Sequence, residues 1–209
     1  MKKLVLSRDF QEIIEEIIKS IKRGKVVVCP TDTVYGLLCD ATNKKAINKL
    51  FQVKKRAPNK PIPIFIKDIK MAKNLALINK PQEKFLKKVW PGKVTVILKA
   101  KKKFPKEVLS KEKKIGLRIP NYKPLHALLS KINFPLSGTS ANISGKPAST
   151  QIKKIINQFK KEKIQPDLIL DAGNLKRSKP STVVDLTSRH LKILRPGEVK
   201  KERLIKIFL

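Results

Sequence analysis

The sequence predicts one α/β domain over residues 1–209, with a twisted mixed β-sheet flanked by helices. Short apolar runs rich in β-branched residues alternate along the whole chain with longer segments of helical periodicity. At 209 residues and 41% hydrophobic content, the chain is long enough to bury a core without stabilising disulfides or metal ions. No internal repeat and no long Gly/Ser-rich linker divides it.

Strands and helices alternate through the first part of the chain. A short strand at residues 4–6 leads into an amphipathic helix over 9–22, in which isoleucines recur at helical spacing. Gly24 ends this helix, and VVVCP forms a buried strand. Asn43 is the expected N-cap of the next helix.

Prolines interrupt the middle of the chain. KKRAPNKP cannot be regular because two prolines bracket it, and IPIFI then resumes as a strand. Apolar spacing predicts the elements that follow, which are helices at 69–77, 81–89 and 124–131 and strands at VTVILK and IGLRIP.

The last part of the chain repeats the alternation. Thr150 is the expected N-cap of a helix over 151–159. Three strands follow, and a helix from about residue 198 to 208 comes last; the strands are DLILDAG, STVVDL and KILRPG.

The net charge of +33 is extreme, and lysine supplies 41 of the 49 basic residues. Lysine is a hydrated point charge, whereas arginine makes the planar, two-pronged bonds of specific phosphate recognition. The excess therefore indicates a compositional bias first and non-specific attraction to nucleic acid second. Aromatic residues make up only 5% of the chain, and the absence of a stacking motif weighs against dedicated nucleic-acid binding.

The acidic residues leave two long windows free. None of the sixteen lies between Asp40 and Asp68, and none lies between Glu112 and Glu162. These gaps contain eight and ten basic residues respectively. If the two windows meet in space, they enclose a concave basic cleft that suits an anionic ligand.

Cysteine usage and the start of the chain indicate a reduced, cytoplasmic protein. Cys29 and Cys39 lie ten positions apart, and with only two histidines the pattern fits neither a zinc site nor a disulfide framework. The apolar run at residues 26–30 is far too short to cross a bilayer. No leader segment precedes it, so neither secretion nor membrane association is expected.

The usual catalytic and nucleotide-binding motifs are absent. The sequence contains no GxxxxGK[ST], GxGxxG, HExxH or GxSxG, and two histidines argue against a Ser/His/Asp triad. An active site here would act by positioning and electrostatics rather than through an activated nucleophile.

Two segments after strands could bind an anion. PTDTVYGLLCDA places Thr31 and Thr33 where open α/β sheets bind ligands, although an ordinary strand and turn explains it equally well. VKKRAPNKP carries four basic residues on a loop stiffened by proline. A solvated surface run is the simpler explanation, but Arg56, one of only eight arginines, favours a phosphate site.

The stretch LSGTSANISGKPAST has hydroxyls on six of its fifteen residues and no carboxylate. Its hydroxyls, amides and small residues could form a nest for phosphate oxygens and a purine edge. A flexible loop is the alternative, and it is disfavoured because the stretch lies between an apolar strand and a helix. RIPNY and LRPGE each add an arginine at a strand end, and Ser181 opens another strand.

Taken in order, these segments resemble the YrdC/TsaC family, which makes threonylcarbamoyl-AMP. The motifs cover most of the chain and include PTDTVYGL, the KxR of Lys54 and Arg56, PGKVTVIL, RIP, the SxN of Ser140 and Asn142, STVVD and LRPG. The resemblance implies a YrdC-like fold in the short, single-domain form. It also implies a nucleotidyltransferase that condenses L-threonine, bicarbonate and ATP, releasing pyrophosphate.

The resemblance also implies roles for individual residues. Catalytic roles would fall to Lys54, Arg56, Ser140 and Asn142. Threonine would be bound by Thr33, Arg118, Thr139 and Ser181. The nucleotide would be bound by Arg56, Lys60, Ala141 through its backbone, Ser149 and Arg195. Phe65 occupies a position that is histidine in some longer relatives, and it can offer only shape.

No protein-bound metal is expected; magnesium would enter with ATP. The threonylcarbamoyl group would pass through partner proteins to the adenosine beside the anticodon of tRNA. Direct RNA binding is a further possible interaction. The main alternative is a basic, non-catalytic RNA-binding protein acting in tRNA or ribosome maturation. A weaker alternative is a carbamoyltransferase accessory domain like those of hydrogenase maturation proteins.

Overall fold

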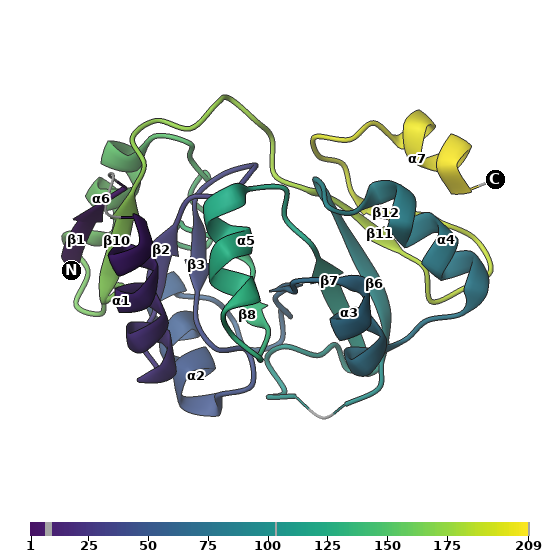
Figure 1. The fold of residues 1–209 in the computed structure, drawn as a ribbon, viewed down its shortest axis with the longest axis horizontal. Helices are drawn as coiled ribbons and strands as arrows, with labels where there is room; N and C mark the ends of the chain where they lie inside the picture. The colour runs from purple at the N-terminus through teal and green to yellow at the C-terminus, as the bar shows by residue number, and fades with distance from the viewer. Residues whose placement is uncertain (7–9, 103, 209) are drawn as a thin grey trace.

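The computed structural model describes residues 1–6, 10–102 and 104–208, so the expected helix start at Asp9 lies outside it. The α/β class with mixed strand pairing and flanking helices is confirmed (Figure 1). The strands are shared between two sheets, which we call sheet A and sheet B. The structure thus has two mixed sheets where the sequence predicted one.

Sheet A has five strands in the order β1-β10-β2-β3-β9. Its first three strands are parallel, and the last two pairings are antiparallel. The three central strands are buried along their whole length, as their apolar sequences require. The strands are β1 (Lys2–Val5), β10 (Leu168–Asp171), β2 (Val27–Cys29), β3 (Gly36–Leu38) and β9 (Thr139–Ser140).

Sheet B has seven strands, six of them in the order β12-β11-β6-β7-β4-β8, and β5 pairs with β6 off this path. The pairings β6–β11 and β4–β7 are parallel and the others are antiparallel. The strands are β12 (Lys192–Arg195), β11 (Thr182–Asp185), β6 (Val94–Ala100), β7 (Lys114–Arg118), β4 (Ile64–Phe65), β8 (Leu136–Ser137) and β5 (Ala76–Leu77).

The two sheets meet in the hydroxyl-rich stretch that the sequence singled out. β8 pairs with β4 of sheet B, and two residues later β9 pairs with β3 of sheet A. Gly138 lies between them, and a Cβ built there would lie 2.8 Å from ring atoms of Phe65. The stretch needs small residues because it passes between two packed sheets.

The helices cover the sheets through two apolar clusters. In the first, α1 isoleucines pack with α5 leucines, confirming the helical spacing of the N-terminal segment. In the second, α2 buries Ile47, Leu50 and Phe51, and Asn43 accepts the Ala46 amide as the expected N-cap. The helices are α1 (Phe10–Lys22), α2 (Lys44–Lys54), α3 (Ile69–Leu75), α4 (Lys80–Val89), α5 (Lys123–Ser130), α6 (Ile152–Phe159) and α7 (Lys201–Phe208).

Several predicted boundaries are wrong, beginning with the first strand, which spans Lys2–Val5 rather than residues 4–6. Gln151, not Thr150, is the N-cap of α6, because Gln151 is extended and forms a β-bridge with Asn174. The helix predicted over 69–77 ends at Leu75, since Ala76 and Leu77 pair with β6 instead. The last helix begins at Lys201 rather than at residue 198.

Residues 172–181, which we call the strap, connect β10 of sheet A to β11 of sheet B. In Figure 1 the strap is the yellow-green coil that crosses between the two sheets along the upper edge. Tyr35 fixes its start, donating to the Gly173 carbonyl at 2.7 Å and accepting the Ala172 amide at 3.0 Å. None of the helices in the described ranges is both long and apolar enough to span a bilayer.

Candidate active site

A cavity of about 380 Å³ lies where the loops of the two sheets converge. Among the residues that the structure describes, its lining contains six cations and no carboxylate. The cations come from the two acid-free windows of the sequence and from the end of β12. They are Lys54, Lys55, Arg56, Lys60, Arg118 and Arg195.

Most residues singled out from the sequence lie on this cavity. The lining includes Thr33, Lys54, Arg56, Lys60, Arg118, Thr139, Ser140, Asn142, Ser181 and Arg195. Ala141 and Ser149 are not part of it. The Ala141 amide donates to the Tyr35 carbonyl at 2.7 Å, and the Ser149 hydroxyl accepts the Gln151 amide at 3.0 Å.

Lys54 is the last residue of α2 and is only 3% exposed, so it does not lie on the proline-stiffened basic loop where the sequence placed it. Its Nζ donates to the carbonyls of Ser140 (2.6 Å) and Asn142 (3.1 Å) and to Asn142 Oδ1 (2.7 Å). Burial, assisted by repulsion from Arg56, lowers the pKa of Lys54 to about 7. Lys54 therefore holds the SxN segment in place.

Arg56 begins the loop that follows α2. The loop turns sharply because Lys55 adopts the left-handed conformation, with φ of 50°. Arg56 Nε donates to the Lys60 carbonyl at 2.8 Å, and Nη2 donates to the Pro61 carbonyl at 3.0 Å. The guanidinium thus braces its own loop, and Arg56 lines the cavity.

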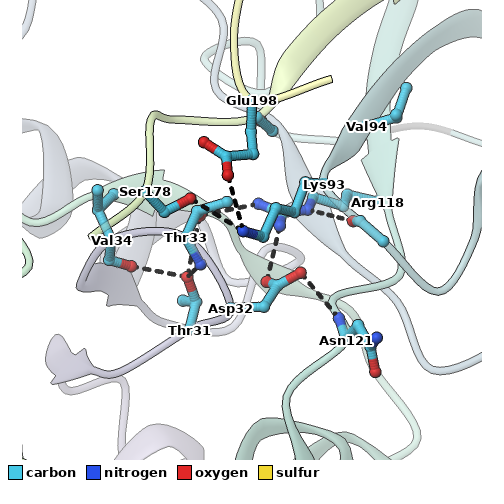
Figure 2. Close-up of polar contacts among 12 residues, drawn as sticks. Thr31, Asp32, Thr33, Val34, Lys93, Val94, Arg118, Asn121, Ser178 and Glu198 are labelled. Atoms are coloured by element: carbon cyan, nitrogen blue, oxygen red, sulfur yellow. Dashed lines mark hydrogen bonds and ion pairs between the residues drawn. The ribbon is translucent and has the colours of Figure 1, made fainter. Parts of the chain in front are cut away.

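Arg118 ends β7 of sheet B, and its guanidinium contacts Asp32 and Thr33 in the segment between β2 and β3 of sheet A (Figure 2). Its Nε donates to the Gly92 carbonyl at 2.8 Å, its Nη2 to Asp32 Oδ1 at 2.7 Å, and its Nη1 to Thr33 Oγ1 at 3.3 Å. The guanidinium carbon lies 5.7 Å from the centre of the Phe65 ring. Phe65 therefore packs against a cation of the site and contributes shape to it.

Ser181 and Arg195 close another side of the cavity. Arg195 Nη2 donates to the Ser181 carbonyl at 2.8 Å, and the Ser181 hydroxyl lies 2.9 Å from that of Thr95. These contacts join the end of the strap to β12 and β6. Ser181 is buried, so its hydroxyl is held rigidly at the cavity wall.

The cations of the site repel one another. Burial and the charge of Arg195 lower the pKa of Arg56. Burial also lowers the pKa of Arg118, and the Asp32 carboxylate opposes that shift. An anionic ligand in the cavity would relieve this repulsion. In the described ranges, no group of three or more His, Cys, Asp or Glu residues could hold a metal ion.

Two polar residues of this region were not among the expected site residues. Ser144 lines the cavity and has a buried hydroxyl without a hydrogen-bond partner in the structure. Asp32 does not line it but is bonded to Arg118. Both belong to segments that the sequence singled out. They were missed because the sequence does not show in which direction each side chain points.

This fold and cavity define an α/β protein with a preformed, cationic pocket for a phosphate- or carboxylate-bearing ligand. A family model for the Sua5/YciO/YrdC domain, described as telomere recombination, matches residues 19–197. The chain belongs to this family.

Individual relatives agree with this assignment. A putative threonylcarbamoyl-AMP synthase of Methanocaldococcus jannaschii is 36% identical over 194 residues, covering 93% of this chain and 90% of that protein. The crystal structure of Pyrococcus abyssi Sua5 complexed with L-threonine matches with a TM-score of 0.89 and 29% identity, covering 99% of this chain and 60% of Sua5. Escherichia coli YciO matches with a TM-score of 0.86 and 27% identity, covering 100% of this chain and 98% of YciO.

Proposed function

We propose that the protein is a threonylcarbamoyl-AMP synthase, a nucleotidyltransferase that condenses L-threonine, bicarbonate and Mg-ATP. The observation that carries the proposal is a preformed cavity lined by six cations and no carboxylate within the described residues. The naming of the Methanocaldococcus relative and the L-threonine complex of Sua5 support the choice of substrates. Neither favours a non-catalytic RNA-binding protein.

The reaction needs charge stabilisation more than proton transfer. The threonine amine and bicarbonate form a carbamate with loss of water, and a carbamate oxygen attacks the α-phosphorus of ATP. The bond to the bridging oxygen breaks, and pyrophosphate leaves with its magnesium. Negative charge builds on the phosphoryl oxygens and on the leaving group, where fixed cations lower the barrier.

The residues divide this work by position. Arg118 and Thr33 would bind the amino acid, with Thr139 and Ser181 beside it. Arg56, Lys60 and Arg195 would bind the phosphates, because their donors reach the cavity from the loop and from β12. Ser140 and Asn142 present the small-residue wall, and Lys54 orders that wall through its hydrogen bonds to both residues.

The proposed reaction implies downstream partner proteins and a cellular compartment. The mixed anhydride would pass to tRNA threonylcarbamoyl-transfer proteins, which modify the adenosine beside the anticodon. The buried, free thiols of Cys29 and Cys39 fit a reducing compartment, and we propose the cytoplasm.

The direct test is pyrophosphate release from Mg-ATP, with and without L-threonine and bicarbonate. Release that requires both, with the mass of threonylcarbamoyl-AMP in the mixture, supports the synthase. A folded protein that releases no pyrophosphate under any of these conditions refutes it.

Replacing Arg56 tests the site itself. Arg56→Ala removes a cation that faces the cavity and should lower the rate of pyrophosphate release by about 10²- to 10³-fold. The matched control is Arg23→Ala, at an exposed position just after α1, which should retain the wild-type rate. Equal rates in the two variants would contradict a role for Arg56.

A further inference from the structure

Asp32 is a buried carboxylate whose two oxygens accept hydrogen bonds from two different residues, one at the end of β7 and one three residues beyond it. Oδ1 accepts Arg118 Nη2 at 2.7 Å, and Oδ2 accepts the Asn121 amide at 3.1 Å (Figure 2). The side chains of Asp32 and Arg118 are only 6% and 3% exposed. Asp32 does not line the cavity, so it contacts Arg118 from behind the site.

The contact with Asp32 determines which edge of the Arg118 guanidinium is left to face the cavity. Nε is committed to the Gly92 carbonyl and Nη2 to Asp32, both on the side away from the cavity. The remaining Nη1 donates to Thr33, which does line the cavity. A planar guanidinium bonded at two of its three nitrogens cannot rotate, so its third nitrogen has one direction.

The neighbouring threonines are ordered in the same way. Thr31 Oγ1 donates its single proton to the Val34 carbonyl at 2.7 Å. In the 3.1 Å contact between the two hydroxyls, Thr33 must therefore be the donor. Thr33 then accepts from Arg118, and the Arg118–Thr33 pair forms one rigid wall of the cavity.

Asp32 also keeps Arg118 charged in a buried place. Burial and the charge of Arg195 disfavour the guanidinium, and Asp32 is the group that opposes them. Removing a buried partner leaves the remaining charge uncompensated, and a charged side chain then reorients toward water or another acceptor.

We propose that Asp32 is a positioning residue: it holds the Nη1 edge of Arg118 beside Thr33 and so sets the affinity for the carboxylate of the amino-acid substrate. This inference rests on the proposed function, since it takes that carboxylate to be the ligand of Arg118. A purely structural ion pair between the 31–35 loop and β7 is the competing explanation.

The test compares Asp32→Asn with Asp167→Asn. Asp167 has the same bonding pattern, with one oxygen on Lys49 (2.6 Å) and the other on the Val26 amide (2.8 Å), but it lies outside the cavity lining. In both variants the dissociation constants of L-threonine and of ATP are measured separately by calorimetry, beside the KM values and the melting temperature.

We expect Asp32→Asn to weaken L-threonine binding by about 10- to 100-fold and to change ATP binding by less than about threefold. Asp167→Asn should lower the melting temperature without changing either affinity. Wild-type threonine affinity in Asp32→Asn, or equal losses for both ligands, overturns the proposal.

A second variant covers a failure of Asp32→Asn to fold. Asp32→Glu keeps the charge but displaces the carboxylate by one methylene, so threonine binding should still weaken selectively; unchanged threonine affinity in this variant overturns the proposal. Failure of the proposed function is distinguishable, because it appears in the wild type as absent threonine binding and absent pyrophosphate release.

Discussion

At the scale of single residues, Lys54 shows how burial changes the role of a basic side chain. Its ammonium donates to three acceptors on Ser140 and Asn142, and a neutral amine has only two N–H bonds to offer. Because its pKa is lowered from 10.5 to about 7, the group loses its proton close to neutral pH. Order in the SxN segment should therefore depend on pH.

We predict that the rate of pyrophosphate release falls as pH rises through about 7, because deprotonated Lys54 releases one acceptor. Lys54→Arg should remove this descending limb, since a guanidinium stays charged throughout. Ionisation of ATP and bicarbonate affects both proteins equally, so the difference between the two pH profiles isolates Lys54. The same limb in both proteins would contradict the assignment.

The stability of the fold should change in the opposite direction. A lysine pKa that is lower in the folded state than in the unfolded chain means that the unfolded chain holds more protons between about pH 7 and 10.5. The free energy of unfolding then rises with pH over this range, and this contribution is lost as pH falls to 7. Activity and stability should therefore change in opposite directions as pH rises, which distinguishes a local effect of Lys54 from general unfolding.

The limits of sequence reasoning are clearest at these residues. Lys54 and Arg56 were singled out from the sequence, and both line the cavity. The direction of the Lys54 side chain could not be predicted, because its acceptors on Ser140 and Asn142 lie 86 and 88 residues away in sequence. Asp32 was not singled out, and its partner Arg118 is also 86 residues distant in sequence.

At the scale of elements, the strap is fastened to sheet B by close backbone packing. A Cβ built on Gly197 would lie 2.4 Å from the Pro180 carbonyl oxygen and 2.5 Å from the Ser181 carbonyl carbon. Glu198 adds a bond to the Lys179 amide at 2.8 Å and an ion pair with Lys93 at 3.2 Å, the latter visible in Figure 2. The glycine of LRPGE is therefore a packing requirement of the segment that carries Ser181.

We predict that Gly197→Ala lowers the free energy of unfolding by about 1–3 kcal/mol, because the backbone at Pro180–Ser181 must move. ATP affinity should fall too, since Arg195 and Ser181 would separate. Gly116→Ala is the control with the milder contacts: a Cβ there would lie 3.1 Å from the end of the Ile97 side chain, which can rotate away, and 3.3 Å from Pro63 Cβ, so a smaller loss of stability is expected. Denaturant unfolding and ATP titration of both variants check the prediction, and equal effects would count against it.

Element prediction succeeded where the signal was local. The Asn43 cap and the isoleucine spacing of α1 depend on neighbouring residues, and both are confirmed. The division into two sheets depends on Gly138, on either side of which the chain changes partners from β4 to β3. Nothing in the local sequence specifies those partners, and a strand as short as β9 carries too little periodicity to be predicted.

At the scale of the whole molecule, most of the positive charge lies outside the cavity. Sixteen carboxylates cannot neutralise forty-nine cations, and the ten ion pairs found among the described residues involve mostly exposed lysines. Such exposed ion pairs contribute little to the free energy of unfolding. Their summed field attracts polyanions over long distances.

We predict that the protein binds RNA weakly, without sequence preference and independently of its cavity. Each phosphate neutralised on a single strand contributes about −0.7 to the slope of log affinity against log salt, so affinity for tRNA should fall steeply between low and physiological salt. Arg56→Ala removes one charge of forty-nine and should leave this slope almost unchanged, although it impairs pyrophosphate release. Fluorescence anisotropy with labelled tRNA at several salt concentrations measures the slope. Affinity that is insensitive to salt, or that is lost in Arg56→Ala, would instead place RNA at the cavity and revive RNA binding as a function of this site.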